Sequence, residues 1–350
     1  MASKREPAGY APWVFVALTA VFAVWTGFGV GGKQVALHVD DLATMAAALI
    51  ATMACARVAL RHGGQLRLFW WLLGAACAAW TLGEAIWASY DFVAGDVPAA
   101  SWADAAYLAA VPLTAAALLV HPALRGRAAG RIRSLVDGLM LAAALFLLAW
   151  TLVFEPVRHQ IDLSSLGGLV TLAYPLGDVV IVLLVVLVIR GTTTGDRRDL
   201  WCLLAGLLLI AFSDAVYTYL TNVRNYASGN VIDTGWFAGY LAIAVGALNA
   251  RMHLSERQPE TTQKLTTAAI LAPFLPILAA LSFAAIWIQF GHHLDHVTLV
   301  AAFVLVGLVL VRQLLLLIDM ITRGEHLVDA LGVGVADHHD ERDAALRGTR

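Results

Sequence analysis

Long apolar stretches constrain the fold of this chain more than any other feature of its sequence. A helix needs about 20 mostly apolar residues to cross the hydrocarbon core of a bilayer. Because lipid offers the backbone no hydrogen bonds, spanning segments are helices that satisfy their own. The sequence therefore predicts an all-α, polytopic integral membrane protein, a helical bundle with ten transmembrane helices: 12–30, 41–60, 68–90, 102–121, 134–154, 165–189, 199–221, 232–250, 265–290 and 296–320.

The composition agrees with lipid as the solvent. Hydrophobic residues make up 60% of the chain and charged residues only 14%, whereas an average soluble domain is about 25% charged. The net charge of −2 gives no indication of a nucleic-acid partner. The three cysteines, Cys55, Cys77 and Cys202, lie inside apolar stretches, so we expect packing residues and neither a disulfide framework nor a zinc site.

The distribution of Lys and Arg predicts the orientation. When the ten spans alternate, only Lys33, Arg158 and Arg224 of the 23 basic residues fall in loops on one side. Cytoplasmic loops of membrane proteins are enriched in Lys and Arg, so both chain ends are expected in the cytoplasm of a bacterial cell, with the protein in the plasma membrane. The domain prediction is a cytoplasmic N-terminus over 1–11, a transmembrane domain over 12–320 and a short cytoplasmic tail over 321–350.

A weak internal repeat relates the third and seventh spans. Trp71 precedes Glu84 by the same interval as Trp201 precedes Asp214, and an aromatic residue follows each acid. The next spans share a Tyr-Leu-Ala sequence. An offset of four helices corresponds to a parallel repeat, with halves 12–121 and 134–250 and the segments 265–290 and 296–320 appended. The matching residues are common in membrane helices, so coincidence is the alternative.

Three carboxylates inside spans require an explanation, because buried acids in lipid are costly and mark functional sites. Glu84 and Asp214 lie in the outer parts of their helices, and Asp178 lies near mid-depth after Pro175, where a kink is expected. The interpretations are protonated or paired structural acids, a ligand site open to the outside, and a proton or ion pathway. Asp104 and Asp137 are interpreted as helix-start residues, where the helix dipole favours an anion.

Aromatic residues gather in the same outer halves. They form either an interfacial belt or, together with the acids, a pocket for a cationic or amphipathic small molecule. The candidate ligand-binding residues are Glu84, Trp87, Trp102, Tyr107, Tyr174, Asp178, Asp214, Tyr217, Trp236 and Tyr240.

The remaining motifs predict little chemistry. His292, His293 and His296 could bind a metal, although a polar turn is the favoured explanation because no second cluster accompanies them. The sequence contains no phosphate-binding loop, nucleophile elbow or zinc-protease motif. We therefore expect no cofactor and no enzymatic activity in this chain.

The last predicted helix continues as an amphipathic stripe. Apolar residues at 314, 317, 321, 328 and 331 approximate a heptad pattern. This pattern predicts either a homodimer formed through the helix extension or an amphipathic end that lies on the membrane.

Several motifs resemble a known family of membrane signalling proteins. They are Trp80-Thr-Leu-Gly-Glu-Ala-Ile-Trp87, Ser101-Trp-Ala-Asp104, Tyr174-Pro-Leu-Gly-Asp178 and Asp233-Thr-Gly-Trp236. Over roughly residues 10–330 the chain resembles the multi-pass N-terminal membrane region of actinobacterial GGDEF and GGDEF–EAL proteins. The resemblance implies a sensor that controls cyclic-di-GMP synthesis or breakdown. The GGDEF and EAL motifs themselves are absent from this chain.

Together these observations predict a membrane sensory or regulatory module. It would detect an outer-side or intramembrane signal and relay it through the last helix to a cytoplasmic signalling partner. A small-solute or proton-coupled transporter and a membrane scaffold protein are the alternatives.

Overall fold

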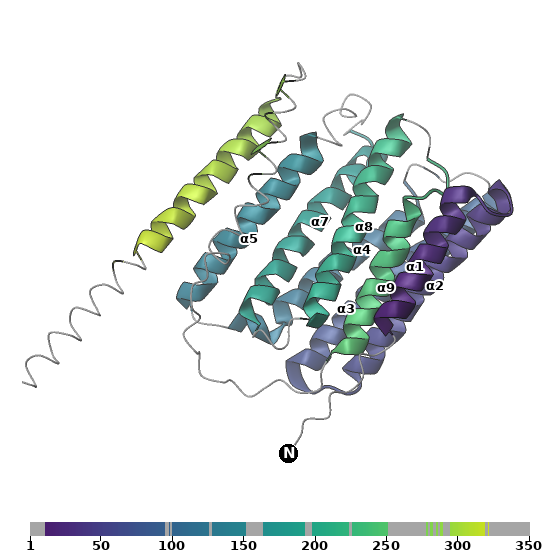
Figure 1. Cartoon of the computed structure of the whole chain (residues 1–350), viewed down its shortest axis with the longest axis horizontal. Coiled ribbons are helices and arrows are strands. Elements are labelled where there is room, and N and C mark those ends of the chain that lie inside the picture. The colour runs from purple at the N-terminus through teal and green to yellow at the C-terminus, as the bar shows by residue number, and fades with distance from the viewer. Residues whose placement is uncertain are drawn as a thin grey trace, which may run out of the picture.

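The computed structural model describes a bundle of helices (Figure 1). It describes residues 11–94, 100–125, 128–151, 164–192, 198–223, 226–250 and 295–318, together with residue 98 and isolated positions between 278 and 321. Every regular element among these residues is helical. The helices are α1 (Ala11–Phe28), α2 (Lys33–Ala59), α3 (Gly64–Ser89), α4 (Trp102–Val120), α5 (Ala128–Ala149), α7 (Leu166–Gly191), α8 (Arg198–Val223), α9 (Asp233–Asn249) and the last helix, His296–Ile318.

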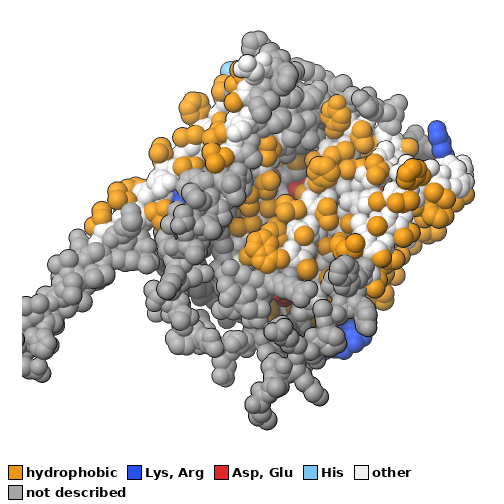
Figure 2. All heavy atoms as spheres, in the orientation of Figure 1, with side chains coloured by type: hydrophobic (Ala, Val, Ile, Leu, Met, Phe, Trp, Pro, Cys, Tyr) orange, Lys and Arg blue, Asp and Glu red, His pale blue; other side chains and the backbone are white. Residues whose placement is uncertain are grey.

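Six of these helices are long and apolar enough to cross a membrane: α2, α3, α4, α7, α8 and the last helix. Two shorter apolar stretches lie in α1 and α5. Large hydrophobic side chains are exposed on many helices, including Phe28 (81%) and Phe303 (76%). Figure 2 shows hydrophobic side chains spread over the visible face of the described helices. The predicted all-helical fold is confirmed for the described residues, and a membrane protein agrees with these six helices.

Two predicted helix boundaries are wrong. Helix α2 begins at Lys33, about two turns before the predicted start at 41, and α5 begins at Ala128 instead of 134. Hydropathy selects only the apolar part of a helix, and these two helices begin in more polar segments, with Lys33 and Gln34 in α2 and Arg131 and Arg133 in α5. The predicted span 265–290 and the predicted tail lie almost entirely outside the described residues.

Six helices form a closed ring, in the order α2, α3, α4, α7, α8 and α9. Each contacts the next, and α9 contacts α2. We call these six the helix ring. Outside it, α1 packs on α9, α5 packs on α7, and the last helix packs on α5 (Figure 1). The ring thus has an interior that is separated from the surrounding lipid.

Small residues bring the ring helices close together. A Cβ atom on Gly206 of α8 would lie 2.6 Å from the carbonyl oxygen of Gly239 on α9, so neither position tolerates a larger residue without a shift of the helices. Membrane helices associate largely through such close packing, because lipid provides no hydrophobic drive for their association. The two glycines therefore set the α8–α9 spacing.

A buried ion pair joins the last helix to α5. The Arg312 Nε donates to Asp137 Oδ1 at 2.7 Å, and both side chains are almost fully buried. Further along the helix pair, Trp150 Nε1 donates to Asp295 Oδ2 at 3.0 Å. The interpretation of Asp137 as a helix-start residue is wrong, because α5 begins at Ala128 and places Asp137 more than two turns inside the helix.

We predict that Arg312→Met lowers the free energy of unfolding by about 3 kcal/mol, because it leaves Asp137 buried without its partner. The double variant Asp137→Leu with Arg312→Met removes both charges and should regain most of that loss. The measurement is a denaturing-detergent titration of the purified protein. Equal stability of the single variant and the original protein would contradict the structural importance of the pair.

His121 ends α4 on the opposite side of the bundle from Trp102. Its ring contacts Phe69 with centroids 4.9 Å apart, and its Nδ1 accepts from the backbone N–H of Ala123. Burial lowers the pKa of His121 from 6.5 to about 4. The residue is therefore neutral in the folded protein near pH 7.

We predict that stability falls between pH 6.5 and about 4 through His121. In this window the unfolded chain binds a proton that the folded chain does not, so lowering the pH favours unfolding, by roughly 3 kcal/mol at pH 4. Unfolding titrations of the original protein and of His121→Asn, which keeps a hydrogen-bond acceptor, give the contribution as a difference. An identical pH slope for the two proteins would contradict it.

Candidate functional site

One cavity lies inside the helix ring, near the end where α2, α4, α7 and α9 begin. We call this the cavity end of the bundle and the space the acidic cavity; its volume is about 90 Å³, enough for several water molecules. Every ring helix contributes at least one carboxylate, and among the residues that the structure describes no Lys, Arg or His lines the space. The seven carboxylates are Asp40, Asp41, Glu84, Asp104, Asp178, Asp214 and Asp233.

Eight aromatic residues complete the wall of the acidic cavity: Trp80, Trp87, Tyr107, Tyr174, Tyr217, Tyr226, Trp236 and Tyr240. Tyr217 is central to them. Its ring lies 4.8 Å from that of Tyr226, 5.8 Å from that of Trp236 and 6.0 Å from that of Trp87, each in an edge-to-face arrangement. Such pairs hold the rings in defined orientations, so the wall is ordered as well as aromatic.

The polar tips of these aromatic residues bind the acids. Tyr240 donates to Glu84 at 3.0 Å, and Trp236 donates to Asp214 at 2.7 Å.

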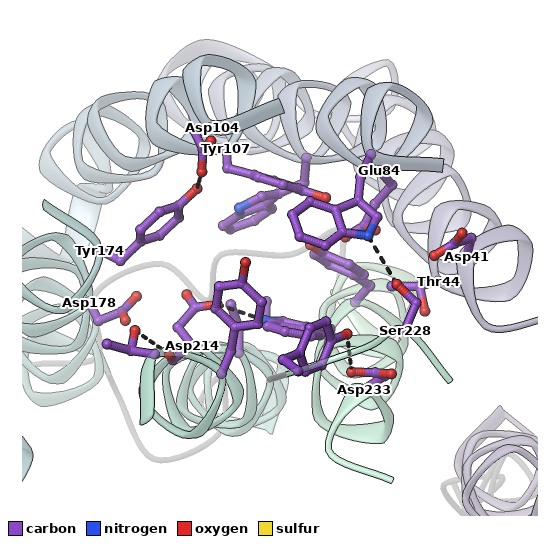
Figure 3. Close-up of a pocket in the computed structure, with 18 of the residues that line it drawn as sticks. Asp41, Thr44, Glu84, Asp104, Tyr107, Tyr174, Asp178, Asp214, Ser228 and Asp233 are labelled. Carbon is purple, nitrogen blue, oxygen red and sulfur yellow. Dashed lines mark hydrogen bonds between the residues drawn. The ribbon is translucent and has the colours of Figure 1, made fainter. Parts of the chain in front are cut away.

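Two further tyrosines do the same. Tyr174 donates to Asp104 at 2.8 Å, and Tyr226 donates to Asp233 at 2.7 Å. Figure 3 shows Tyr174 directed at Asp104, with the Asp178 carboxyl facing the space between them and Asp214. Four of the seven carboxylates are thereby held by a neutral donor, which orients each of them without supplying a positive charge.

Glycine at position 83 allows the Tyr107 ring to pack closely against α3. A Cβ atom on Gly83 of α3 would lie 2.5 Å from the ring of Tyr107, so only glycine lets that ring lie flat against the helix beside Glu84.

Three polar atoms in the wall have no hydrogen-bond partner. They are Asp40 Oδ1, Asp41 Oδ2 and Thr44 Oγ1, one turn of α2, and their residues are only 3%, 4% and 4% exposed. The carboxyls of Asp40 and Asp233 lie against each other, so two acceptors meet there. Buried polar groups normally find partners, and a proton shared between two carboxyls, a water molecule or a bound cation would satisfy these atoms.

The segment between α8 and α9 covers the acidic cavity at its end. The backbone N–H of Gly229 donates to Asp40 Oδ2 at 2.9 Å, and Ser228 donates to Asp91 Oδ2 at 2.6 Å. Trp87 Nε1 in turn donates to Ser228. Gly229 has a φ of 85°, a conformation that favours glycine. We call residues 226–232 the covering loop.

The covering loop also carries Tyr226. Burial, followed by the nearby charge of Asp233, raises the pKa of Tyr226 well above its usual value. Its hydroxyl is therefore a neutral donor to Asp233 near neutral pH.

Nine of the ten candidate residues identified in the sequence line the acidic cavity. The exception is Trp102, the first residue of α4, which is 76% exposed and lies outside the cavity. Asp104 has two roles: it caps α4 with Ser101, as predicted for a helix start, and it also receives the Tyr174 hydroxyl.

Sequence reasoning missed the Asp40-Asp41 pair. Asp40 immediately precedes the predicted 41–60 span and Asp41 is its first residue, so two adjacent acids at the start of an apolar run were the available signal. His292 and His293 lie outside the described residues, and His296 is exposed. No cluster that could hold a metal ion is present among the residues that the structure describes.

Comparison of the chain with protein-family models, with curated proteins and with solved structures found no match.

We predict that Tyr240→Phe destabilises the protein by about 1–3 kcal/mol, because Glu84 stays buried and loses a donor. Trp236→Phe should have a similar effect through Asp214. Tyr219→Phe on the flank of α8 is the matched control and should change stability by less than about 0.5 kcal/mol. Detergent-unfolding titrations compare the three variants; a Tyr240→Phe protein as stable as the control would show that the Glu84 contact contributes nothing.

Proposed function

We propose that this chain is a sensory module of the cell membrane that binds a small organic cation in the acidic cavity. The observation that carries the proposal is the charge balance of the cavity wall: seven carboxylates, several of them deeply buried, and no basic side chain. Carboxylates this close cannot all be ionised in a low-dielectric interior unless a positive charge lies among them. The unpartnered atoms of Asp40, Asp41 and Thr44 add acceptors for a ligand.

The wall favours an organic cation over a metal ion. A divalent metal needs several oxygen or nitrogen ligands at close range, and no such group exists among the described residues. The carboxylates are instead distributed around the space and alternate with aromatic faces. Aromatic faces attract organic cations, and aromatic cages that bind quaternary ammonium groups use this attraction.

The proposed side of approach is the outside of the cell. Arg57 and Arg61 at the end of α2, Arg67 at the start of α3 and Arg198 at the start of α8 lie at the end of the bundle opposite to the acidic cavity. Under the positive-inside rule that end faces the cytoplasm. The acidic cavity then opens toward the outer half of the membrane.

The proposed internal repeat gains support from the helix contacts. In the repeat, α2, α3 and α4 correspond to α7, α8 and α9. A two-fold rotation would then relate the α4–α7 contact to the α9–α2 contact, and the α3–α4 contact to the α8–α9 contact. All four of these contacts occur. Glu84 and Asp214 then occupy equivalent positions. Each receives a donor from α9, so the two halves are similar in layout but not in detail.

A mechanical connection to the cytoplasmic side supports the sensory interpretation. Asp178 lies on α7, α7 packs on α5, and α5 is joined to the last helix by the Asp137–Arg312 pair. A ligand that changes the packing of α7 would therefore displace the last helix, provided that it prefers one of two arrangements. The resemblance to membrane regions of GGDEF proteins agrees with a cytoplasmic partner or a second copy at the end of that helix.

A proton-coupled transporter is the second candidate. Asp178 lines the acidic cavity and also a second cavity on the flank of α7, so it is accessible from two spaces. A carboxyl accessible from two sides is a component of proton-coupled transport.

We predict that the protein in lipid nanodiscs binds tetramethylammonium saturably in equilibrium dialysis with the radiolabelled ion. Asp214→Asn and Glu84→Gln should each weaken binding about tenfold or more, since each removes a charge facing the ligand. Asp199→Asn, at the opposite end of α8, is the matched control and should bind as the original protein does. Absence of saturable binding would exclude the cation site.

The same preparation separates a sensor from a transporter. Spin labels at Leu60, which is 67% exposed, and Leu317, which is 50% exposed, report the position of the last helix relative to the ring. A sensor shows a changed distance distribution when tetramethylammonium is bound. An unchanged distribution combined with cation uptake into proteoliposomes, lost in Asp178→Asn, would replace the sensor with the transporter.

A further inference from the structure

A second cavity lies on the outside of the helix ring, between α5, α7 and α8. We call it the apolar cavity; its volume is about 500 Å³. Among the described residues of its wall, Asp178 is the only carboxylate and Tyr219 is the other residue with a polar side-chain group. The remaining wall residues are Leu145, Leu148, Pro175, Val179, Val182, Leu208, Ala211, Phe212, Ala215 and Val216.

The apolar cavity is elongated along α8. Its α8 residues run from Leu208 to Tyr219 at helical spacing on one face, a length of about 16 Å at 1.5 Å per residue. Ala211 and Ala215 form its floor because their side chains are small. A long, narrow and apolar space of this kind fits a single hydrocarbon chain.

Asp178 belongs to both cavities. On α7, Tyr174 and Ile181 face the acidic cavity, whereas Pro175, Val179 and Val182 face the apolar cavity. Asp178 lies where these two faces of the helix meet, close to Asp214 on α8. One ligand molecule could therefore occupy both cavities, with its apolar chain in the apolar cavity, its charged group in the acidic cavity and Asp178 beside the point where the two parts join.

The covering loop makes the flank the less obstructed route. Gly229 and Ser228 of the loop are bound to Asp40 and Asp91, which covers the end of the acidic cavity. Among the described residues, the wall of the apolar cavity is apolar apart from Asp178 and Tyr219, and its Phe212 is 61% exposed. A molecule dissolved in lipid would reach Asp178 from the side, along α8.

We propose that the ligand is a single-chain cationic amphiphile, such as a long-chain amine or quaternary ammonium compound. Its cationic head would lie among Asp178, Asp214 and the aromatic wall, and its hydrocarbon tail would lie in the apolar cavity. This proposal rests on the proposed cation-binding function and adds the class of ligand. The carboxylates repel anionic lipid headgroups. The small volume of the acidic cavity excludes large headgroups of any charge.

The test compares two probes in nanodiscs, tetramethylammonium and dodecyltrimethylammonium, the latter at low mole fraction in the lipid. The variants Ala211→Trp and Leu208→Trp each place an indole in the apolar cavity. Val180→Trp is the matched control, because Val180 is 46% exposed on α7 and lies outside both cavities. Comparing variants in the same lipid cancels the partitioning of the amphiphile into the bilayer.

We expect Ala211→Trp and Leu208→Trp to weaken binding of dodecyltrimethylammonium about tenfold, while tetramethylammonium binds them as it binds the original protein. Retained tetramethylammonium binding also shows that the variants are folded. If both probes bind and neither variant affects the long-chain probe, the tail lies in bulk lipid and the amphiphile proposal is overturned, with the cation site intact. If neither probe binds the original protein, the proposed function fails as well.

Discussion

Carboxyl groups enclosed by apolar helices dominate the energetics of this structure. An ionised carboxylate in a low-dielectric interior is costly unless a positive charge or several donors compensate it. The chain meets this requirement in two different ways. Asp137 has a partner within the chain, Arg312, whereas the seven carboxylates of the acidic cavity share a space without any basic side chain. In the first arrangement the two opposite charges compensate each other, whereas in the second the compensation comes from protons or from a cation.

The arrangement of the helices follows from this difference. The Asp137–Arg312 pair lies between α5 and the last helix, outside the ring, where it fixes one helix to another. The acids of the ring instead point inward, and the hydroxyl or indole N–H groups of Tyr174, Tyr226, Trp236 and Tyr240 hold four of them. Neutral donors orient a carboxylate without neutralising it. The ring therefore encloses oriented carboxylates that are available to the proposed cation.

Helix α7 connects the parts of the molecule that the proposed function requires. It carries Tyr174 and Asp178 in the wall of the acidic cavity, and Pro175, which removes a backbone donor within the helix. Its other face packs on α5 and lines the apolar cavity. A ligand at Asp178 would thus act on the one ring helix that contacts α5 and, through it, the last helix. The proposed ligand class and the proposed relay depend on the same residue for this reason.

Much of the fold was predictable because hydropathy and length select helices in a lipid environment. The sequence by itself determined that the chain is helical, that it suits a membrane, and that Glu84, Asp178 and Asp214 need a special environment, since an acid in an apolar run is anomalous wherever it lies. It did not determine which acids meet. Asp40 and Asp41 lie at the edge of a predicted span, Asp137 resembles a helix-start residue, and Trp102 resembles the other outer aromatic residues, because hydropathy measures a residue's own sequence surroundings. Closure of the ring decided that six distant segments place their carboxylates in one cavity, and packing of the last helix on α5 decided that Arg312 reaches Asp137. Both kinds of contact depend on how helices pack and not on the composition of any one of them.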